Sequence, residues 1–433
     1  MKEQTSIPKD KIGRAASLTA AGARVGVNYL KYAGKKALTG NGDKEKFHQR
    51  TAAEAFGTFS KLKGSPLKLA QMLSLDRNLL PDPYVKEFSK AHYSAPPLSY
   101  PLVVKTFLSE MDKSPDKIFD EFGKKAIAGA SIGQVHKAKL DGHDYAVKIQ
   151  YPGVAESIHS DLSIVKPLAM RLFKLDAKAI NPYINEVEER LTEETDYQLE
   201  LRRSLELAEK SSQLANIQFP NFHAELSSKR ILTMDWVAGE VLDEFCQRNE
   251  DSQLADLIGQ SLWDFYHHQV HTLRVFHADP HPGNFKVIDD QLWVLDFGCV
   301  KALPDDFYRQ YFSLMEPEIL ADPEKFRQSL YKIGLLLPDD SPAAVAKLTE
   351  VFHQSVDLLS RPFQHEVFDF GDQSYFRELA DFGDQTRDDQ ELQSLNAARG
   401  NADALYLNRT YFGLYNLAGA LKAKIRTSRP AIS

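Results

Sequence analysis

One short stretch of this chain constrains its fold more than any other: residues 277–284, which read His-Ala-Asp-Pro-His-Pro-Gly-Asn. It places Asn284 five residues after Asp279, and Asp296-Phe297-Gly298 begins twelve residues beyond Asn284. A phosphoryl-transfer site needs hard oxygen ligands for Mg²⁺ and one carboxylate aimed at the attacking group. This spacing predicts Asn284 and Asp296 as the Mg²⁺ ligands and Asp279 as the catalytic base.

The tripeptide Asp-Phe-Gly occurs three times, beginning at Asp296, Asp369 and Asp381. Only Asp296 follows a short apolar run, residues 292–295, and only Asp296 comes after the pattern at Asp279. The other two copies lie in an acidic stretch, where we expect helix boundaries or loops with no strand before them. The copy at Asp296 is therefore the predicted functional one, and its spacing is typical of the protein-kinase-like fold.

Composition narrows the class of protein further. With 433 residues and 43% hydrophobic content, the chain has room for two or three packed domains. It contains no run of 18 apolar residues and no cleavable signal pattern, so we expect neither a transmembrane helix nor a signal peptide. Cys246 and Cys299 are the only cysteines, which argues against a disulfide framework and favours a reducing compartment. We expect a cytoplasmic protein or one bound peripherally to the cytoplasmic side of a membrane.

Charge is distributed unevenly along the chain. The first 50 residues carry eleven Lys and Arg against four Asp and Glu, a net charge of +7, whereas the whole chain carries −7. The Ala-rich residues 12–38 have the composition of a segment that lies on an anionic membrane surface. A solvated arm explains the same pattern equally well. Nucleic-acid binding fits less well, because no recognisable reader motif accompanies the charge, and we expect no nucleic-acid partner.

Between residues 44 and 112 the hydrophobic periodicity is helical. Ser65 followed by Pro66 predicts a helix start, which places Lys68 in the first turn and Gln71 on the same helix face. A lysine fits that position poorly, because the N-terminus of a helix favours anions. We therefore expect Lys68 to pair with a carboxylate from elsewhere in the chain.

Beyond residue 115 the pattern changes to alternation and later returns to helical spacing. The predicted strands are residues 126–131, 134–140, 144–151 and 231–237. One long helix is predicted at residues 185–211, and a helical region is predicted from residue 304 to about residue 425. The predicted fold class is α+β, a bilobal protein-kinase-like fold with an N-terminal helical extension packed over the active site and a helical C-lobe. The predicted divisions are a basic arm at 1–43, the helical extension at 44–115, the N-lobe at 116–240 and the C-lobe at 241–433.

Lys148 lies among apolar neighbours on the third predicted strand, where a kinase-like fold places the lysine that binds ATP phosphates. A buried ammonium needs a carboxylate partner, and the long predicted helix offers Glu194, Asp196 and Glu200. Glu194 and Glu200 are six residues apart and point to different sides of one helix. We therefore expect two acidic partners for two basic sites.

The predicted nucleotide-binding segments are a hairpin loop and a strand. The loop is Ala128, Gly129, Ala130 and Ser131, whose small side chains let backbone N–H groups approach phosphate oxygens. Alanine restricts φ more than glycine does, so this loop should be stiffer than the glycine-rich loop of a protein kinase. The strand that runs into the predicted hinge supplies the other expected nucleotide contacts: Met234, Asp235, Trp236 and Val237.

Taken together, these motifs resemble the UbiB family, also called aarF-domain proteins. These are atypical protein-kinase-like proteins linked to the biosynthesis of coenzyme Q and other isoprenoid quinones. The resemblance is strong from about residue 44 to residue 300 and looser beyond. Besides the two motifs near Asp279 and Asp296, it rests on four segments: residues 68–71, 128–136, 146–154 and 194–196.

The resemblance implies roles for individual residues. Lys68 and Gln71 match the family's K-x-G-Q signature, on a helix folded over the active site where a protein kinase would dock its peptide. Glu194 and Asp196 match the family's E-x-D motif and would engage Lys68. Glu200 would pair with Lys148, and residues 128–131 match the alanine-rich loop. The implied cofactors are ATP or ADP with Mg²⁺, in an ATPase of lipid or quinone metabolism whose protein kinase activity in trans is suppressed.

Two positions depart from the family pattern. Ala70 stands where the signature has glycine, which adds a methyl group where the helix should pack closely. Gly129 stands where the loop usually has alanine, which loosens the loop and weakens any inference about a preference for ADP or ATP.

Three functions fit the motifs. The first is an ATPase or small-molecule kinase that supports quinone biosynthesis or lipid homeostasis at a membrane, with an anionic membrane surface and quinone-precursor lipids as partners. The second is a protein kinase; it fits less well because Ala278 replaces the arginine of H-R-D and no A-P-E motif follows Asp296. The third is a nucleotide-binding pseudokinase scaffold, which the complete set of motif residues disfavours.

Overall fold

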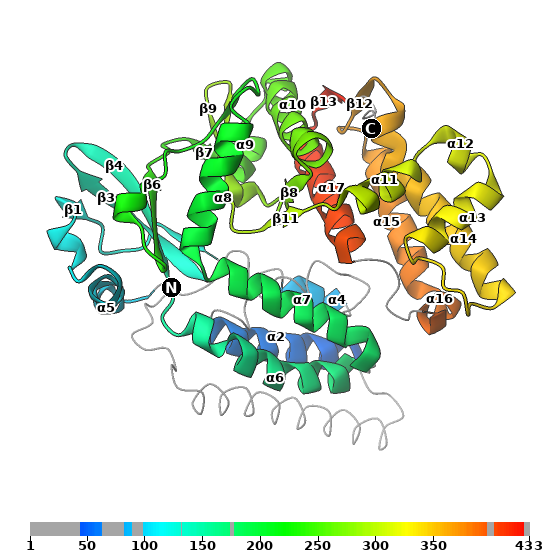
Figure 1. Cartoon of the computed structure of the whole chain (residues 1–433), viewed down its shortest axis with the longest axis horizontal. Coiled ribbons are helices and arrows are strands. Elements are labelled where there is room, and N and C mark those ends of the chain that lie inside the picture. Colours follow the sequence, from blue (N-terminus) through cyan, green and yellow to red (C-terminus); the bar gives the residue numbers. More distant parts are fainter. Residues whose placement is uncertain are drawn as a thin grey trace. The chain divides into compact units, whose positions relative to one another are not determined.

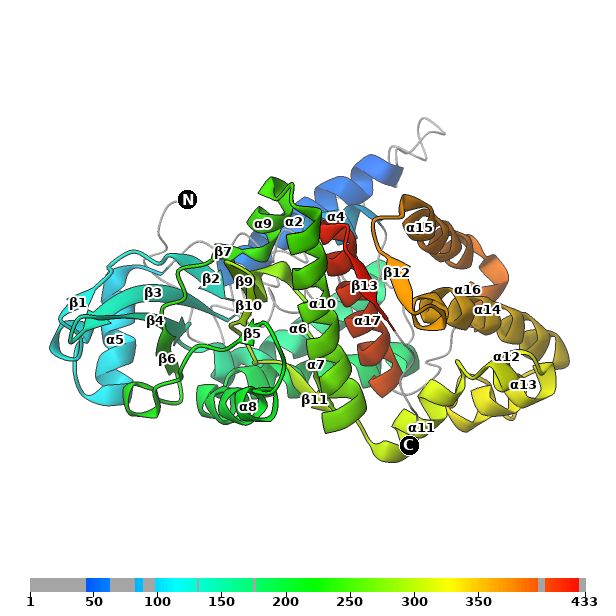
Figure 2. The same ribbon diagram turned by 90° about the horizontal axis from the view of Figure 1, so that it is seen from above.

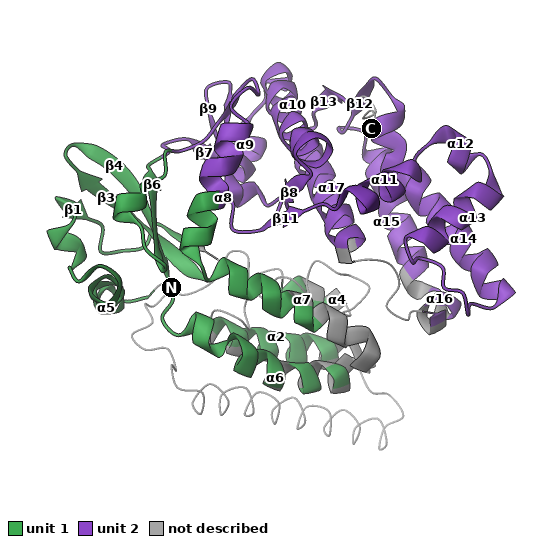
Figure 3. Cartoon of the chain, in the orientation of Figure 1, with its two compact units in different colours: residues 1–202, 221–236 green, residues 203–220, 237–433 purple. Residues whose placement is uncertain are grey.

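The computed structural model describes residues 44–62, 82–88, 98–130, 132–173, 177–395 and 402–427. The chain forms two compact units, drawn in green and purple in Figure 3. Unit 1 consists of residues 1–202 and 221–236, and unit 2 of residues 203–220 and 237–433. The chain therefore passes between the units three times, at residues 202/203, 220/221 and 236/237, and each unit is described by itself below.

Unit 1 is built on a five-stranded antiparallel sheet (Figure 1). The strands are β1 (Glu121–Phe122), β2 (Ala128–Ala130), β3 (Gly133–Leu140), β4 (His143–Gln150) and β6 (Ile231–Asp235). Their order is β1-β3-β4-β6, and β2 pairs with β3. The four strands predicted from alternation are thus confirmed. Asp141 and Gly142 both have positive φ, at 50° and 80°, as a two-residue turn between twisted antiparallel strands requires.

An aromatic core lies between this sheet and helix α5 (Tyr100–Met111). Phe107 of α5 packs edge-on against Phe119 and Phe122, with ring centroids 6.4 and 5.5 Å apart. The buried side chains of Val147 and Ile149 on β4 complete this cluster from the sheet. Burial of these side chains fixes the register of β4, because a shift by one residue would turn them to the other face of the sheet.

The other helices in the described part of unit 1 are α2 (Lys44–Leu62), α4 (Asp82–Phe88), α6 (Val154–Phe173), α7 (Ala177–Glu194) and α8 (Tyr197–Lys210), and α8 continues into unit 2. The single helix predicted at 185–211 is wrong, because the chain breaks between α7 and α8. The break has a local cause: Asp196 Oδ1 accepts hydrogen bonds from the N–H groups of Gln198 and Leu199, at 3.0 and 3.2 Å. Asp196 therefore caps a new helix instead of continuing the old one.

Unit 2 is mainly helical, as predicted after residue 304. Its longer helices are α10 (Ser252–His268), α14 (Pro342–Ser360), α15 (Gln373–Asp388) and α17 (Ala402–Leu421). Shorter ones are α9 (Leu242–Arg248), α11 (Asp305–Ser313), α12 (Pro317–Leu320), α13 (Pro323–Lys332) and α16 (Gln390–Leu395). Figure 2 shows α10 and α17 side by side, and the two helices are in contact.

Three small sheets complete unit 2. The first has the order β5 (Ile217–Gln218), β10 (Gln291–Val294), β9 (Phe285–Ile288) and β7 (Glu240–Val241). The second pairs β8 (Val275–His277) with β11 (Val300–Ala302), and the third pairs β12 (Val367–Asp369) with β13 (Lys424–Arg426). The first two sheets frame the predicted catalytic motifs.

The two additional Asp-Phe-Gly copies lie in structures that differ in part from the prediction. Asp369 ends strand β12, so the expectation that no strand precedes it is wrong, whereas Asp372 three residues later caps α15 at the predicted helix boundary. Asp381 lies inside α15, not at a boundary or in a loop. Gly383 is tolerated there because the helix pattern around it is otherwise continuous.

No helix within the described parts of the chain combines the length and the apolar character that crossing a bilayer requires.

Candidate active site

The catalytic motif near Asp279 begins at the β8–β11 pair. His277 at the end of β8 lies opposite Val300 at the start of β11. One residue further, the Ala278 N–H donates to the Cys299 carbonyl at 2.8 Å. The antiparallel pair therefore brings the residue before Asp279 next to the residue after the Asp-Phe-Gly motif.

The β9–β10 hairpin connects the same two motifs at a second place. Phe285 on β9 lies opposite Val294 on β10. The Leu295 N–H donates to the Asn284 carbonyl at 2.9 Å, so Asn284 lies beside the residue that precedes Asp296. The β8–β11 pair and the β9–β10 hairpin together bring Asp279, Asn284 and Asp296 to one end of two small sheets.

Short hydrogen bonds orient these side chains. The Asn284 amide nitrogen donates to the Asp279 carbonyl at 2.9 Å, which turns the Asn284 amide oxygen the other way as a candidate ligand. Asp296 Oδ1 accepts from the Gly298 N–H at 2.8 Å. An amide oxygen and a carboxylate are hard donors of the kind Mg²⁺ prefers, so the residues present fit the predicted ion.

In the described part of the chain, no three His, Cys, Asp or Glu side chains gather as a metal-binding group. Mg²⁺ commonly binds through one or two carboxylates together with substrate phosphates and water. The pair Asn284 and Asp296 fits that mode and does not fit a metal cage made by the protein alone.

The loop between β8 and β9 is held by hydrogen bonds that the sequence motif did not reveal. His277 is buried, and its backbone N–H donates to the side-chain oxygen of Gln269 at 2.8 Å. Its ring Nδ1 lies 3.3 Å from the hydroxyl of the buried Tyr266. His281 Nδ1 accepts from the Gly283 N–H at 3.1 Å and caps the short turn Pro282–Asn284. Gln269 and Tyr266 belong to no motif, and only the fold brings them to the loop.

Unit 1 holds the predicted lysine. Lys148 on β4 is 7% exposed, and its Nζ donates to Glu200 Oε1 at 2.7 Å, which confirms the predicted pairing. The Lys148 ammonium also lies 5.1 Å from the centre of the Tyr197 ring. A buried ammonium needs such partners, and the carboxylate and the tyrosine ring supply them here.

The phosphate-loop prediction concerns residues 128–131, of which Ser131 lies outside the described residues. Ala128 and Gly129 are exposed on β2. A Cβ built on Gly129 meets nothing within 4 Å, whereas one built on Gly133 would lie 2.5 Å from the Ile149 carbonyl oxygen and 2.7 Å from the Tyr197 hydroxyl. Glycine is therefore required at Gly133 and not at Gly129, a distinction that spacing alone could not make.

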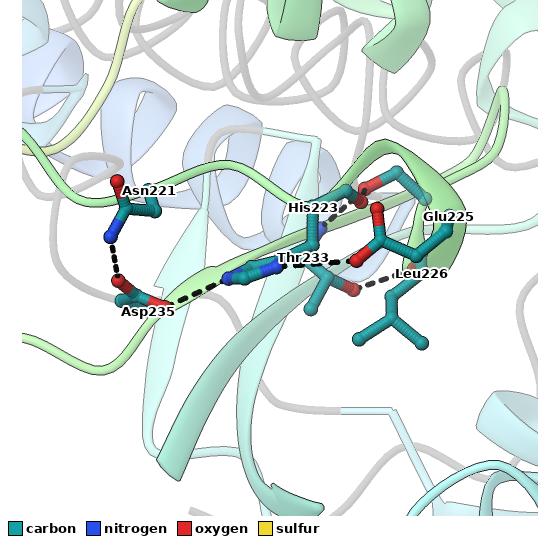
Figure 4. A network of polar contacts seen from close by, with 7 residues as sticks. Asn221, His223, Glu225, Leu226, Thr233 and Asp235 are labelled. Carbon is teal, nitrogen blue, oxygen red and sulfur yellow. Dashed lines mark hydrogen bonds and ion pairs between the residues drawn. The ribbon is translucent and has the colours of Figure 1, made fainter. Parts of the chain in front are cut away.

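The strand predicted to contact nucleotide is tied into a polar network, drawn in Figure 4. The Asn221 amide donates to Asp235 Oδ2 at 2.7 Å, and His223 Nε2 lies 2.8 Å from Asp235 Oδ1. The other ring nitrogen of His223 lies 3.3 Å from Glu225 Oε1. Burial raises the pKa of Asp235, but the hydrogen bonds from His223 and Asn221 outweigh burial and hold this pKa below its ordinary value. Asp235 is thus an ionised anchor of the strand.

Two backbone groups of the predicted nucleotide contacts are already engaged. The Trp236 N–H donates to the Asp144 carbonyl at 2.9 Å, within unit 1. The Val237 carbonyl accepts from Lys286 Nζ at 2.7 Å, within unit 2. Contacts to nucleotide from Met234, Asp235, Trp236 and Val237 stay a prediction, and Lys286 is a neighbour that the motifs did not indicate.

Lys68 of the second predicted ion pair lies outside the described residues, as does Gln71 on the same predicted helix face. Glu194, one of its candidate acids, is 7% exposed at the end of α7. Asp196 uses Oδ1 to cap α8. Glu194 and Glu200 lie on two different helices, so their separation has a cause other than the one predicted, which was opposite faces of a single helix.

Comparison with protein families supports the kinase-like interpretation. The family model described as the ABC1 atypical kinase-like domain matches residues 90–330. A solved structure titled as the complex of Rv3197 with erythromycin, from Mycobacterium tuberculosis, is similar at a TM-score of 0.59 and 25% identity. It covers 88% of this chain and 95% of that one. The α+β kinase-like fold class is therefore confirmed.

Curated relatives carry kinase names. The chain is 28% identical over 382 residues to the probable serine/threonine-protein kinase abkA of Dictyostelium discoideum, covering 82% of this chain and 66% of the relative. It is 29% identical over 334 residues to AarF domain-containing protein kinase 1 of Xenopus laevis, covering 75% and 64%. It is 29% identical over 350 residues to the mitochondrial atypical kinase coq-8 of Caenorhabditis elegans, covering 77% and 46%. The chain thus spans between about half and two thirds of the length of these relatives.

Proposed function

Because the chain belongs to the ABC1 atypical kinase-like family, also called the UbiB family, we propose that it binds Mg²⁺ with ATP or ADP and hydrolyses ATP or transfers its terminal phosphoryl group to a small or lipid acceptor. We further propose that this activity supports the biosynthesis of ubiquinone or another isoprenoid quinone, or lipid homeostasis, at a membrane. One observation carries the proposed chemistry: the β8–β11 pair and the β9–β10 hairpin bring Asp279, Asn284 and Asp296 together.

In this proposal each residue has a separate task. Asn284 and Asp296 hold Mg²⁺, and the hydrogen bond from the Asn284 amide to the Asp279 carbonyl keeps the ligand oxygen and the base in one fixed relation. Asp279 accepts the proton of the attacking water or hydroxyl. Bound Mg²⁺ supplies charge neutralisation on the phosphates.

Lys148 binds phosphate oxygens in the same proposal, and Glu200 keeps it ionised and oriented. The exposed residues Ala128 and Gly129 are proposed to offer backbone N–H groups to the phosphates. The complete set Lys148, Glu200, Asp279, Asn284 and Asp296 supports an active enzyme over a pseudokinase scaffold.

A protein kinase is the second candidate, supported by the name of the abkA relative. Ala278 argues against it, because protein kinases use an arginine there to respond to a phosphorylated activation loop. Lys68 paired with Glu194 or Asp196 would hold the N-terminal helices over the peptide-docking surface, which is the proposed reason that protein substrates are excluded.

The test is ATP turnover by the purified full chain with Mg²⁺, with and without anionic liposomes and phenolic quinone-precursor analogues. Wild type should turn over ATP and respond to lipid or phenol, whereas Asp279→Asn should bind nucleotide but lose turnover by about 10²-fold or more, the usual contribution of a general base. Phosphate incorporation into a generic protein substrate at a comparable rate would favour the protein kinase instead. Tight nucleotide binding with no turnover by wild type would favour the scaffold.

The membrane part of the proposal rests on the basic residues 1–43. Deleting residues 1–40 should reduce co-sedimentation with anionic liposomes and leave nucleotide binding in place, since attraction to anionic lipids grows with each basic residue near the surface. Neutral liposomes provide the matched control. Co-sedimentation that neither the deletion nor high salt changes would remove the arm as a membrane contact.

A further inference from the structure

Helix α17 (Ala402–Leu421) contacts the segments on both sides of the predicted catalytic loop, although no motif marks it. All of these segments lie in unit 2. The contacts involve three positions of the loop region: Pro280 directly after Asp279, Lys301 after the Asp-Phe-Gly motif, and His271 before β8.

The tightest contact joins Gly413 to Pro280. A Cβ built on Gly413 would overlap Pro280 Cγ and lie 3.1 Å from Pro280 Cβ. A proline ring cannot rotate away as the end of a flexible side chain can, because its ring is closed onto its own backbone. Any side chain at position 413 must therefore move either α17 or the backbone of Pro280, and movement of Pro280 would carry the adjoining Asp279 with it.

Displacement of Asp279 would not stay local. The Asp279 carbonyl accepts from the Asn284 amide at 2.9 Å and from the His281 N–H at 2.8 Å. The first of these bonds sets the direction of the predicted Mg²⁺ ligand. A side chain at position 413 would thus affect, through Pro280, both the predicted base and one predicted metal ligand.

A second contact holds the far end of the motif. Lys301 on β11 pairs with Asp403 of α17 at 3.2 Å, and its ammonium lies 4.1 Å from the centre of the Tyr406 ring. The side chains of Lys301 and Asp403 are 10% and 16% exposed, so the pair is shielded from water. Lys301 lies opposite Phe276 in the β8–β11 pair, so this contact also fixes the strand that leads into Asp279.

The third contact reaches the turn before β8. The Tyr411 hydroxyl of α17 lies 2.9 Å from His271 Nε2, in a π-helical turn that spans Gln269–Leu273. That turn carries Gln269, whose side chain accepts from the His277 N–H. Single π-helical turns often occur at functional sites, and this one forms part of the support of the catalytic loop.

We infer that α17 is a positioning element for the phosphoryl-transfer site, with Gly413 as the residue that lets Pro280 hold Asp279 in its working place. The inference rests on the proposed function, because positioning matters only if Asp279 is the base. Gly413 touches neither predicted base nor predicted ligand, so it acts through Pro280.

The test compares two glycines of the same helix. In Gly413→Ala the new methyl meets the rigid Pro280, whereas in Gly419→Ala it meets the end of the Phe376 ring, with Cζ 2.5 Å away. Gly413→Ala should lower kcat for ATP turnover by about 10²-fold, because a misplacement of about 1 Å costs that much. KM for ATP should change much less than kcat, since the lysine site and Asp296 are untouched and only the Asn284 ligand is reached through Asp279. Gly419→Ala should keep kcat within about threefold.

Rescue separates positioning from a general packing defect. Pro280→Ala removes the ring that Gly413→Ala strikes, so the double variant should recover at least about tenfold in kcat over Gly413→Ala, as expected for residues in direct contact. Asp403→Asn provides a second variant should Gly413→Ala fold poorly. It should lower kcat by about tenfold with KM unchanged, a loss of roughly the size that mutations away from the chemistry produce when they shift it.

Hydrogen exchange gives a readout that needs no activity. Gly413→Ala should raise exchange of the amides of residues 275–285, and Gly419→Ala should not. If wild type shows no ATP turnover, the proposed function fails while the exchange result still decides whether α17 holds this loop. Equal losses of kcat in the two glycine variants, or unchanged exchange and kcat in Gly413→Ala, would overturn the inference.

Discussion

Two lysines, one in each unit, have nearly the same immediate surroundings. Lys148 pairs with Glu200 at 2.7 Å and lies 5.1 Å from the centre of the Tyr197 ring. Lys301 pairs with Asp403 at 3.2 Å and lies 4.1 Å from the centre of the Tyr406 ring. Both ammonium groups are shielded from water. Both buried lysines thus have a carboxylate and a tyrosine ring as neighbours. These neighbours alone do not distinguish the function of one lysine from that of the other.

The difference lies in what each pair connects. Lys148 is on β4, which pairs with β3, and β3 pairs in turn with β2, where phosphate binding is proposed. Lys301 connects the strand after the Asp-Phe-Gly motif to α17. Position in the fold therefore distinguishes a lysine proposed to act on the nucleotide from one inferred to hold the loop in place.

The largest expected effect separates these roles at Lys148. Lys148→Met should reduce ATP turnover by about 10³-fold, which corresponds to about 4 kcal/mol of transition-state stabilisation. It should also destabilise unit 1, because removing one partner of a buried pair costs about 3–5 kcal/mol. Adding Glu200→Leu should restore the free energy of unfolding but not the turnover. Recovery of turnover in the double variant would mean that Lys148 has no role beyond structure.

The next effect concerns the metal. Asp296→Asn should weaken Mg²⁺–ATP binding by about 100-fold, or about 2.7 kcal/mol, because an amide replaces a charged ligand. Asp369→Asn is a matched control, since Asp369 Oδ1 accepts from the Gly371 N–H at 2.8 Å just as Asp296 Oδ1 does from Gly298. Asp381→Asn is the control within a helix. Thermal-shift titration with Mg²⁺–ATP measures all three, and equal losses would contradict the assignment of Asp296.

Lys301 should behave differently from Lys148. Lys301→Met should lower turnover by about tenfold, or about 1.4 kcal/mol, together with a loss of stability, because Asp403 is left without its lysine. Adding Asp403→Leu should restore both stability and most of the turnover, since an apolar pair of similar size can hold the same elements together. Steady-state kinetics and urea unfolding of the single and double variants give the answer. A double variant that stays inactive would place Lys301 in the chemistry.

Acid should lower the free energy of unfolding through His267 and His271, the second of which contacts Tyr411 of α17. Burial lowers the pKa of His267 from 6.5 to about 4 and that of His271 to about 2. The unfolded chain therefore binds more protons below pH 6.5, so stability present above that pH is lost as the pH falls toward 4. The expected slope is about 1.4 kcal/mol per pH unit for each histidine. Urea unfolding at pH 7.5, 6.5 and 5.5 measures it, with the fluorescence of Trp263, which stacks on His267, as the probe.

His267→Phe should flatten this dependence, because an apolar ring replaces the imidazole that resists protonation. The exposed His159 provides the control, and His159→Gln should leave the slope unchanged. An unaltered slope in His267→Phe would assign the acid sensitivity to other groups.

The smallest expected effect is at the loop near Lys148. Gly129→Ala restores the alanine usual in the family, and its methyl group meets nothing within 4 Å. It should raise stability by about 0.4–1 kcal/mol by restricting the unfolded chain, and it should change the affinity ratio of ATP to ADP by less than about threefold. Gly133→Ala should instead destabilise the protein by about 1–3 kcal/mol, since its methyl group would strike the backbone of Ile149. Isothermal titration and thermal unfolding of the two variants test the contrast, and a destabilised Gly129→Ala would contradict it.

Sequence reasoning succeeded where the signal was local. The strands β3 and β4 followed from alternation, and β6 followed from an apolar run. A buried lysine needs a carboxylate, and the family resemblance implied that Glu200 is the partner of Lys148. It failed at the helix predicted at 185–211, because nothing in the charged helical pattern showed that the Asp196 side chain would accept hydrogen bonds from the N–H groups of Gln198 and Leu199. It also failed at Asp369, where a three-residue strand is too short to leave a pattern.

The sequence by itself determined the kinase-like family and the α+β class. It also indicated Asp279, Asn284 and Asp296 as the proposed reactive residues, because their spacing is set by short strands and a tight loop. Tertiary structure decided which distant residues support that loop. Nothing in the sequence connects Gly413 to Pro280 or Lys301 to Asp403, because each contact forms only when α17 packs beside the two small sheets. Local spacing specifies the reactive groups, whereas long-range packing specifies how firmly they are held.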